Sequence, residues 1–479
     1  MCFSQRVAVC LVSSSVLLVA LYGPMVKSRK CADPKAYKIT RVRPETVQLG
    51  PKMSSDPFPC KLADLARTSR TNLTAPKDVT VPRWTLHFGQ MTYNTPLIDG
   101  SGNIYLVTTL GEVFSADPNG EKRWSMMIRD QPANPAMEDG VLFVSDASGL
   151  AWAIDTATGQ PRWVERIGHK GSPGNYGITL GHGIAIFHAD LGIPPGQSVA
   201  HSDFIAMESA TGKELWRNRV NADFFNVIPS FADGGTSLVY TDMDGGTVKL
   251  ETKTGKTIWT RQGYPWPMPH PEGKFTSGPG GAPRTHSGLA LIGDGPAEGL
   301  VFTAGNPTPA TGRVKALRLD DGTEVWSREI DKMMGNNGAY AVIDGIPTLV
   351  VGAGVTAMHP IPESRPPFFG TVHAFHAVTG DPLWLFDADA HNQWVAAGSI
   401  ILPGCIDMNL PDAFSSPTVD ARGTVYIGWH GGYLYALDGR NGRLISKYNT
   451  EEGIQGQPAI GPSGELIVIA GRTLYSFWH

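Results

Sequence analysis

The sequence predicts an all-β fold, an eight-bladed β-propeller whose ring is closed by an N-terminal outer strand. Three observations predict it: a repeated unit with closely spaced turns, a tryptophan at a fixed place in that unit, and an unusual composition. Of 479 residues, 56 are Gly and 37 are Pro, and only 18% are charged. Such a composition is typical of one large all-β domain with many tight turns, and a chain of this length can bury a large core.

The repeat is clearest in residues 139–163, which read DGVLFVSDASGLAWAIDTATGQPRW. The turn pairs DG, SG and TG separate runs of β-branched and aromatic residues, which is the pattern of successive hairpins. A Trp follows the last Gly of the unit by four residues, and this spacing recurs along the chain. The pairs are Gly120 and Trp124, Gly159 and Trp163, Gly212 and Trp216, Gly255 and Trp259, Gly322 and Trp326, and Gly380 and Trp384.

Two further units are atypical. Residues 423–446 keep the turns but place Ser446 where the Trp is expected, so we expect that blade to be looser. The unit that begins at Gln457 ends before its last strand, whereas Pro82 to Trp84 match the end of a unit. We therefore expect residues 82–88 to supply the outer strand of the blade that contains residues 457–478, because this pairing hides sheet edges.

Each unit is expected to form one four-stranded sheet, which cannot bury both faces alone and must pack on its neighbours around a ring. The tryptophans of the outer strands are expected to wedge between adjacent blades as structural residues. Replacing one of them with Ala should cost about 3 to 5 kcal/mol of stability. They are Trp84, Trp124, Trp163, Trp216, Trp259, Trp326 and Trp384.

The pattern Ala-x-Asp-x-x-Thr-Gly-x-x-x-Trp, as in residues 153–163, resembles the tryptophan-docking motif of the pyrroloquinoline-quinone (PQQ) dehydrogenase family. The resemblance covers residues 82–479 and implies the eight-bladed fold. Non-enzymatic outer-membrane assembly lipoproteins share the repeat, so it implies no single activity. The alcohol dehydrogenases of the family hold PQQ over a calcium ion, beneath a disulfide of adjacent cysteines. This sequence has no adjacent cysteines, no CxxCH haem motif and no matching calcium ligands, so PQQ with calcium stays an alternative without its expected markers.

The first 26 residues are predicted to be a signal peptide or a signal anchor. Val7 to Val26 carry no charge, and about 20 apolar residues suffice to span a bilayer. Lys27, Arg29 and Lys30 follow this run, and the positive-inside rule would keep that side in the cytosol. Similar proteins work outside the cytoplasm, so we expect an extracytoplasmic chain that is either anchored in the membrane or secreted.

Residues 27–80 are predicted to be an extended, weakly packed tether that precedes the propeller at residues 81–479, because they lack sustained strand or helix periodicity. Removing residues 1–75 is therefore not expected to destabilise the ring. Two alternatives stay open for Cys31 and Cys60 in this segment, a disulfide and a pair of free thiols. Asn72 begins the one glycosylation sequon of note, which matters if the chain is secreted by a eukaryote.

Charge and motifs exclude several classes of function. The formal net charge is −4, and no run of Lys and Arg is long enough to track phosphates, so nucleic acid is not an expected partner. The sequence has no P-loop, no GxSxG elbow, no dinucleotide fingerprint after a strand and no HExxH pair. We expect a small-molecule ligand, with a protein partner as the alternative and membrane contact only through the N-terminal segment.

Long insertions into the repeat fall on one face of the predicted ring, which we call the insertion face. The opposite face, which we call the turn face, keeps turns of a few residues. Because loops tolerate insertion and sites are grafted onto them, we expect function on the insertion face. The insertions are residues 188–202, 262–286, 305–312, 352–370 and 387–415.

The predicted site is a funnel on the axis of the insertion face. Its apolar walls are expected to be Trp266, Trp394 and Trp429. Its polar floor is expected to be Asn175, Asn226 and Asn336. These three belong to a wider set of amide residues that directly precede the inner strands; the other members are Asn94, Asn134 and Gln457. The side chains suited to move protons near neutral pH, should the site be catalytic, are His270, His391 and His430. No metal site is predicted.

Structural explanations for the same residues stay open. The aromatic residues equally fit a role in holding long loops on the ring, and Asn before a strand equally fits a turn preference. Three functions therefore remain: a small-molecule site, binding or catalytic; a scaffold for protein assembly; and a PQQ-dependent oxidoreductase. A scaffold predicts an exposed apolar strip, and a quinoprotein predicts a cluster of carboxylates and amides around calcium on the axis.

Overall fold

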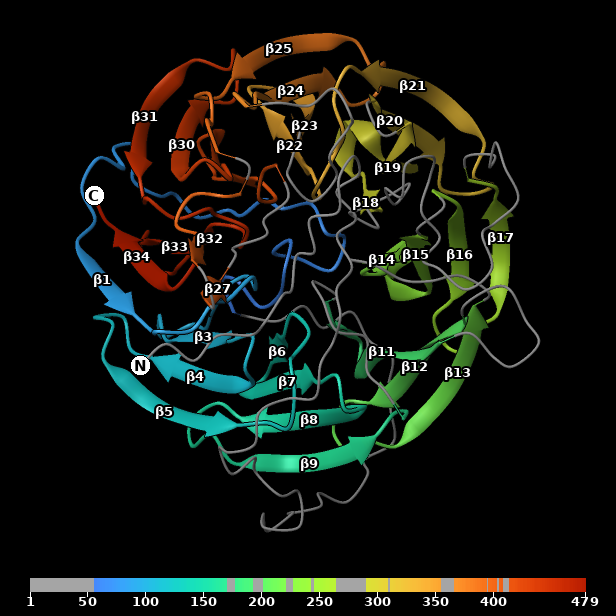
Figure 1. The fold of residues 1–479 in the computed structure, drawn as a ribbon. Coiled ribbons are helices and arrows are strands. Elements are labelled where there is room, and N and C mark those ends of the chain that lie inside the picture. The colour runs from blue at the N-terminus through green and yellow to red at the C-terminus, as the bar shows by residue number, and fades with distance from the viewer. Residues whose placement is uncertain are drawn as a thin grey trace, which may run out of the picture.

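Eight four-stranded antiparallel sheets stand around a central axis in the described part of the chain, which confirms the eight-bladed propeller (Figure 1). Each sheet runs from an inner strand beside the axis to an outer strand at the rim. The computed structural model describes residues 56–169, 177–192, 201–220, 227–242, 245–263, 290–308, 311–354, 366–393, 395–402, 405–407 and 413–479.

The first four blades follow one another along the chain, each with its strands in sequence order. Blade 1 is β2 (Leu97–Ile98), β3 (Ile104–Val107), β4 (Glu112–Ala116) and β5 (Lys122–Met127). Blade 2 is β6 (Ala136–Glu138), β7 (Val141–Ser145), β8 (Leu150–Asp155) and β9 (Pro161–Arg166). Blade 3 is β10 (Thr179–Gly181), β11 (Ile184–Gly192), β12 (His201–Glu208) and β13 (Glu214–Val220). Blade 4 is β14 (Ser230–Ala232), β15 (Ser237–Thr241), β16 (Thr247–Glu251) and β17 (Thr257–Arg261), with the 3-10 turn η2 (Asp233–Gly235).

The other four blades complete the ring. Blade 5 is β18 (Leu291–Ile292), β19 (Leu300–Thr308), β20 (Thr311–Arg318) and β21 (Glu324–Ile330), with η3 (Gly295–Ala297). Blade 6 is β22 (Ala339–Ile343), β23 (Ile346–Gly354), β24 (Gly370–His376) and β25 (Pro382–Asp387). Blade 7 is β28 (Thr418–Val419), β29 (Thr424–Gly428), β30 (Tyr433–Asp438) and β31 (Leu444–Asn449). Blade 8 is β32 (Ala459–Ile460), β33 (Leu466–Ala470), β34 (Thr473–Phe477) and β1 (Trp84–His87).

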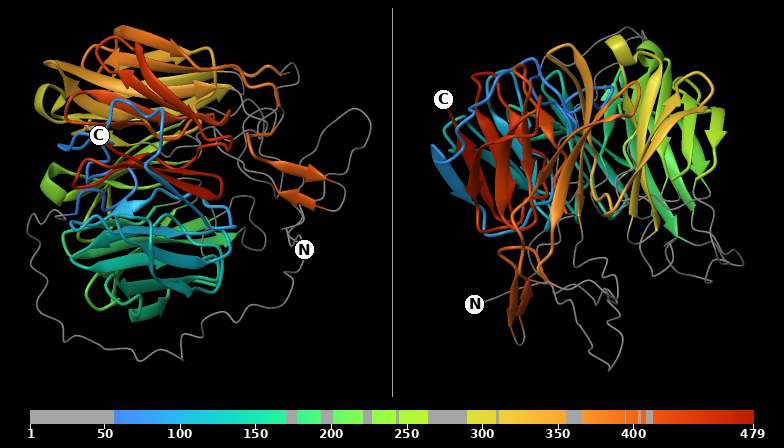
Figure 2. Two further views of the ribbon diagram at one scale, coloured as in Figure 1. Left: turned by 90° about the vertical axis from the view of Figure 1, so that its left-hand side faces the viewer. Right: turned by 90° about the horizontal axis from the view of Figure 1, so that it is seen from above.

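Two short strands, β26 (Ile400–Leu402) and β27 (Cys405–Asp407), pair with each other outside the blades. This hairpin stands away from the ring in the side views (Figure 2). It lies within the stretch between blades 6 and 7 that the sequence marks as an insertion.

The N-terminal strand closes the ring, as predicted. Trp84 lies opposite Ser476 and His87 lies opposite Thr473 in the antiparallel pair of β1 and β34. The first and last described elements of the propeller thus share one sheet. The pairing removes the edge that an open ring would leave exposed.

The outer-strand tryptophans lie between blades, which confirms their structural role. In each of seven blades the indole N–H donates to a main-chain carbonyl of the next blade; Trp216, for example, donates to Thr252 at 2.8 Å. The indole ring lies against the repeat glycine of that blade, and a Cβ added at Gly255 would meet the Trp216 ring at 2.5 Å. Gly255 also has a φ of +68°, so this position requires glycine for two reasons.

Ser446 takes part in a different kind of contact at the remaining interface. Its hydroxyl donates to the carbonyl of Lys77 at 2.6 Å and accepts from the amide of Val79 at 3.0 Å. Val79 and Ala75 are fully buried here, packed with Tyr426 in the same core cluster. The N-terminal main chain therefore occupies the place where other blades put an indole.

Residues 56–69 form a plug across the turn face, over the central axis (Figures 1 and 2). They make main-chain hydrogen bonds to the inner strands of six blades, at Ile98, Met137, Phe231, Ile292, Tyr340 and Val419. Arg67 reaches blade 3 through the carbonyl of Ile178, and Gln457 of blade 8 accepts from the amide of Leu62 at 2.7 Å. The plug thus touches every blade of the ring.

The expectation of a weakly packed tether is therefore wrong for residues 56–80. Phe58 is completely buried, and Arg67 is only 1% exposed. The segment has no repeating pattern because each plug residue meets a different blade, so periodicity does not reveal it. Residues 27–55, where the tether stays a prediction, and residues 1–26, with the predicted signal segment, lie outside the described residues.

Three smaller expectations concern the same region. Cys60 is a free, buried thiol, and its proposed partner Cys31 lies outside the described residues. Asn72 of the sequon is exposed, and its glycosylation stays a prediction. Within the described ranges, no helix has the length and apolar character needed to cross a bilayer.

Candidate functional site

The structure describes four of the nine predicted site residues. Asn336, Trp429, His391 and His430 are placed, and all four are buried. The other five, Asn175, Asn226, Trp266, His270 and Trp394, lie outside the described residues and stay predictions.

Trp429 and His430 form an aromatic stack at the end of β29. Their ring centroids lie 4.2 Å apart and nearly parallel, and His391 meets His430 edge-on at 4.8 Å. His391 is held here by paired main-chain hydrogen bonds with Phe368, whose ring is perpendicular to that of His430 with the centroids 6.3 Å apart. The structure therefore brings together three predicted residues, His391 from the insertion between blades 6 and 7 and the adjacent Trp429 and His430 from the end of β29.

The electrostatics of this stack do not favour proton transfer at neutral pH. Burial, with a smaller contribution from His391, lowers the pKa of His430 to about 3. His430 is thus neutral over the physiological range. Nε2 of His391 lies 2.7 Å from the carbonyl oxygen of Val395. A carbonyl oxygen only accepts, so Nε2 is the protonated nitrogen of the ring and donates a hydrogen bond to this loop. Both rings fasten the insertions to blade 7.

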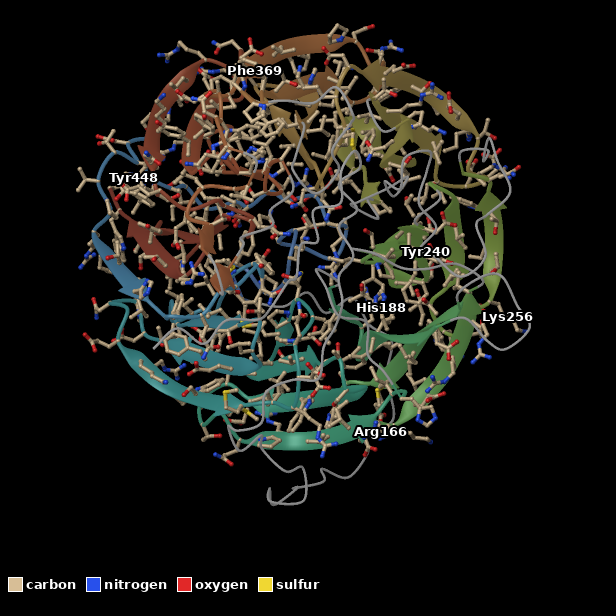
Figure 3. All side chains as sticks on the ribbon, in the orientation of Figure 1. Arg166, His188, Tyr240, Lys256, Phe369 and Tyr448 are labelled. Atoms are coloured by element: carbon tan, nitrogen blue, oxygen red, sulfur yellow. The ribbon has the colours of Figure 1, made fainter. Side chains whose placement is uncertain are left out.

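A second buried histidine lies between blades 3 and 4. Figure 3 labels His188 and Tyr240 in this region, and Phe204 stands between them with ring centroids 4.7 Å from each. Burial lowers the pKa of His188 to about 3. Like His430, this residue belongs to an aromatic core and is uncharged at neutral pH.

The amides before the inner strands bond neighbouring blades to one another. Oδ1 of Asn134 accepts from the amide of Thr95 at 3.0 Å, and Oδ1 of Asn336 accepts from the hydroxyl of Ser416 at 3.1 Å. Nε2 of Gln457 donates to the carbonyl of Pro417 at 3.0 Å. Turn preference does not account for these bonds across blades, which sequence reasoning did not consider.

Several polar atoms beside these bonds remain unpaired among the described residues. Their side chains are all at least nine-tenths buried, and they lie a few residues before the inner strands β2, β6, β22 and β32. We call these residues the axial belt. The unpaired atoms are Oγ1 of Thr95, Nδ2 of Asn134, Nδ2 of Asn336, Nδ2 and Oδ1 of Asn337, and Oε1 of Gln455.

A cofactor of the PQQ type would need a calcium site on the axis. The described residues contain no group of three or more His, Cys, Asp and Glu side chains that could hold a metal ion. The axial belt consists of amides and a hydroxyl, whereas calcium prefers carboxylate ligands. The described residues therefore do not fit the calcium site that such a cofactor requires, and no chemical step through PQQ follows from them.

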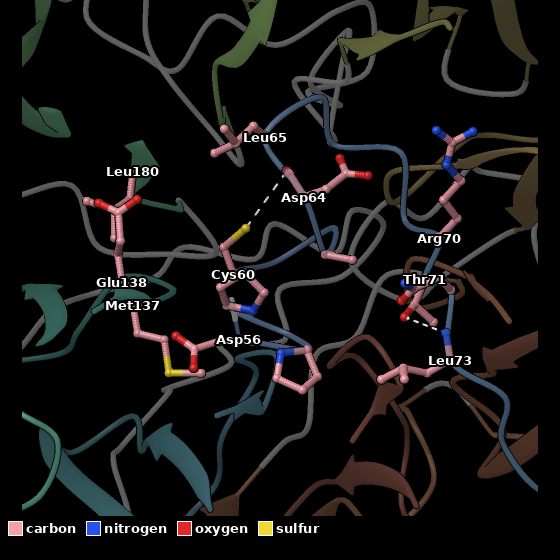
Figure 4. Close-up of a pocket in the computed structure, with 14 residues that line it drawn as sticks. Asp56, Cys60, Asp64, Leu65, Arg70, Thr71, Leu73, Met137, Glu138 and Leu180 are labelled. Carbon is pink, nitrogen blue, oxygen red and sulfur yellow. Dashed lines mark hydrogen bonds between the residues drawn. The ribbon is translucent and has the colours of Figure 1, made fainter. Parts of the chain in front are cut away.

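A cavity of about 520 Å³ lies on the turn face, between the plug and the inner strands of blades 2 and 3 (Figure 4). Its lining includes Asp56, Cys60 and Asp64 of the plug together with Glu138 and Leu180 of the blades. Sequence reasoning did not predict this cavity, because the residues of the plug that build it were assigned to a tether.

The comparisons with known proteins agree with this architecture. A family model described as outer membrane protein assembly factor BamB matches residues 82–187 and 197–359, more than half of the chain. Tetrathionate hydrolase of Acidithiobacillus ferrooxidans is 24% identical over 223 residues, which cover 44% of this chain and 38% of that protein. Outer membrane protein assembly factor BamB of Yersinia pestis is 22% identical over 368 residues, covering 72% of this chain and 83% of that protein.

Solved structures show the same fold. Quinohemoprotein alcohol dehydrogenase of Comamonas testosteroni matches with a TM-score of 0.61 at 13% identity, covering 88% of this chain and 80% of that one. At this identity the likeness concerns the fold alone. The docking tryptophans, the closed ring and the family match together show that the chain belongs to the PQQ-like β-propeller family whose model is described as outer membrane protein assembly factor BamB.

Proposed function

We propose that this propeller binds a small polar molecule on its axis at the insertion face, outside the cytoplasm. The axial belt carries this proposal, because it gathers unpaired polar atoms from four blades around the axis. Buried polar groups are normally satisfied, and leaving one without a partner costs about 1 to 3 kcal/mol. A ligand that pairs with them removes this cost. The extracytoplasmic location rests on the relatives named as outer membrane assembly factors.

The belt also indicates the chemistry of the ligand. Asn134, Asn336 and Asn337 present amide N–H groups, and Thr95 presents a hydroxyl, whereas acceptors come only from Asn337, Gln455 and that hydroxyl. A molecule that offers carbonyl or carboxylate oxygens matches this excess of donors. The plug closes the other end of the axis, so the ligand would enter from the insertion face.

The experiment uses substitutions that change one atom. Asn336→Asp and Asn134→Asp keep the Oδ1 that bonds the neighbouring blade and replace the unpaired N–H group with an oxygen. Asn441→Asp is the matched control, because Oδ1 of Asn441 also accepts from a main-chain amide, that of Arg443, but the residue is exposed. Native mass spectrometry of the purified proteins measures the bound molecule.

We expect the two belt variants to lose the ligand while Asn441→Asp retains it, and melting temperatures establish that each variant is folded. A wild-type protein that carries only water, or belt variants that retain the ligand, would exclude the axial site. Finding PQQ among the released molecules would instead favour an oxidoreductase.

A protein-assembly scaffold is the second candidate, and an exposed apolar strip favours it. An aliphatic residue directly precedes the docking Trp on the outer strands of blades 3 to 6, whereas blades 1 and 2 have Arg123 and Arg162 there. These aliphatic side chains are Leu215, Ile258, Val325 and Leu383, and they are between 38% and 52% exposed. Replacing all four with Ser should abolish capture of a partner by the intact protein without lowering its melting temperature, and unchanged capture would exclude this surface.

A further inference from the structure

Arg67 of the plug is a buried cation that binds only neutral oxygens within the described part of the chain. Its guanidinium donates to the carbonyl of Lys61 at 2.7 Å, to the carbonyl of Ile178 at 3.2 Å and to the hydroxyl of Thr179 at 3.3 Å. Its Nε atom has no partner among the described residues, although the residue is only 1% exposed. Buried charges are normally paired with an opposite charge. Arg67 therefore lacks the partner that its burial calls for.

Two titratable groups of the plug lie near Arg67 and do not pair with it. The carboxylate of Asp64 accepts from the amide and the hydroxyl of Thr68, and it is directed towards Arg70 (Figure 4). Burial raises the pKa of Asp64, and Arg67 opposes this rise less than Thr68 and Arg70 do. Burial also raises the pKa of the Cys60 thiol, so this group is neutral at pH 7. Neither residue supplies a negative charge bound to Arg67.

Arg67 lies next to the axial belt. Ile178, whose carbonyl binds Arg67, donates its amide to the carbonyl of Asn134 at 3.2 Å. Cys60, whose thiol lies beside Arg67, forms a β-bridge with Ala136, two residues after Asn134. Asn134 belongs to the belt, and its Nδ2 is unpaired. A residue of the plug and a residue of blade 2 are thus neighbours, and each has an N–H group without an acceptor among the described residues.

The main chain of the plug holds these groups in an unfavourable conformation. The φ angle is +59° at both Arg67 and Ser69, +71° at Leu62 and +68° at Ala63, a region that residues other than glycine rarely adopt. The amide of Ser69 donates to the carbonyl of Leu62 at 2.9 Å, and Leu62 is held by Gln457 of blade 8. Ser69 is completely buried, and its hydroxyl is also unpaired. Strain that the surrounding structure maintains in this way is typical of ligand-binding segments.

The charge of Arg67 selects among the molecules that the belt can accept. An amide N–H such as that of Asn134 binds a carbonyl or a carboxylate oxygen, whereas a buried guanidinium favours an anion. One guanidinium matches one negative charge, because a dianion would leave a buried charge unpaired. Lys61, the other buried cation of the plug, already interacts with other groups. The donors therefore fit a molecule with a single carboxylate.

We propose that the ligand of the axial site is a small monocarboxylate, and that its carboxylate group lies between Arg67 of the plug and Asn134 of blade 2. This inference rests on the axial site proposed above and adds the charge and the orientation of its ligand. The carboxylate end would face the plug, and the rest of the molecule would face the insertion face, where it enters. Three donated bonds fix the guanidinium of Arg67, and its Nε–H is left for the ligand.

The test compares acetate with acetamide, which has the same size and shape but no charge, on the full chain at pH 7. Saturation-transfer difference NMR measures the dissociation constant of each probe. Arg67→Gln removes the charge and keeps an amide donor, and Arg67→Lys keeps the charge. Arg261→Gln is the matched control, because Arg261 also donates to main-chain carbonyls, those of Thr260 and Asp321, but is exposed on an outer strand. Melting temperatures establish that each variant is folded.

We expect the wild type to bind acetate about thirtyfold more tightly than acetamide, the lower end of the usual scale for one buried charge pair. Arg67→Gln should bind the two probes equally, whereas Arg67→Lys and Arg261→Gln should keep the preference for acetate. Equal binding by the wild type, or an unchanged preference in folded Arg67→Gln, would overturn the proposal. The comparison in the wild type needs no variant, so it decides the matter even where a substitution prevents folding.

The belt variants separate this proposal from the axial site itself. Asn134→Asp places a negative charge beside Arg67 and should abolish acetate binding. Acetate binding that both Asn134→Asp and Asn336→Asp retain would place the anion away from the axis and overturn the proposal. If acetamide binds as tightly as acetate and both are lost in the belt variants, the axial site stands and only its preference for an anion is refuted.

Discussion

Replacing Phe58 with Ala tests whether the N-terminal segment belongs to the fold. Phe58 is completely buried between blades 8 and 1, in one core cluster with Ile98, Ile467 and Leu474. Its main chain exchanges two hydrogen bonds with Ile98, and the substitution keeps them. The loss is therefore the buried ring itself, which corresponds to about 3 to 5 kcal/mol of unfolding free energy.

The assay is equilibrium unfolding in urea, followed by tryptophan fluorescence. Phe369→Ala is the matched control, because Phe369 is 52% exposed and its truncation should change stability by less than about 0.5 kcal/mol. A weakly packed tether would make the two variants equal, so coincident unfolding curves would refute the plug. By the same reasoning, removing residues 1–75 should now destabilise the ring, contrary to the expectation from sequence.

Three further predictions concern buried groups. Arg67→Ala leaves the carbonyls of Lys61 and Ile178 without their donor and should lower the unfolding free energy by about 2 to 5 kcal/mol in the same urea assay. Arg67→Lys should recover part of this loss. Equal stability of the wild type and both variants would contradict the prediction. Trp216→Ala should lower the unfolding free energy by about 3 to 5 kcal/mol, because it removes a buried indole. Ser446→Ala loses two hydrogen bonds and no ring, so it should lower the unfolding free energy by only about 1 to 3 kcal/mol. If Ser446→Ala were the more destabilising variant, the N-terminal main chain would not replace an indole at the interface of blades 7 and 8 as described. Burial lowers the pKa of His430 from 6.5 to about 3, so below pH 6.5 the unfolded chain binds a proton that the folded chain does not, and the unfolding free energy should fall on acidification towards pH 3. The variant His430→Phe should reduce this pH dependence of the unfolding free energy by about 1.4 kcal/mol per pH unit. An unchanged pH dependence in that variant would show that His430 is accessible to protons in the folded protein.

The sequence determined the ring and its closure because these depend on short-range patterns. Each blade repeats the same turns, and every docking Trp except Trp84 lies four residues after a glycine that the indole of the preceding blade covers. The match of Trp84 to the end of a unit was sufficient to predict its pairing with the last strand. The sequence also identified His391, Trp429 and His430, which the structure brings together, and the amides before the inner strands.

Only the tertiary structure decided what those residues do. A sequence does not show that Asn134 uses one amide atom on its neighbour blade and leaves the other unpaired, or that burial keeps His430 neutral. The plug was missed altogether, because its contacts with all eight blades are long-range and each residue has a different partner. Periodicity reveals a segment that meets the same neighbour repeatedly, whereas a segment that crosses the axis of a ring meets each blade once.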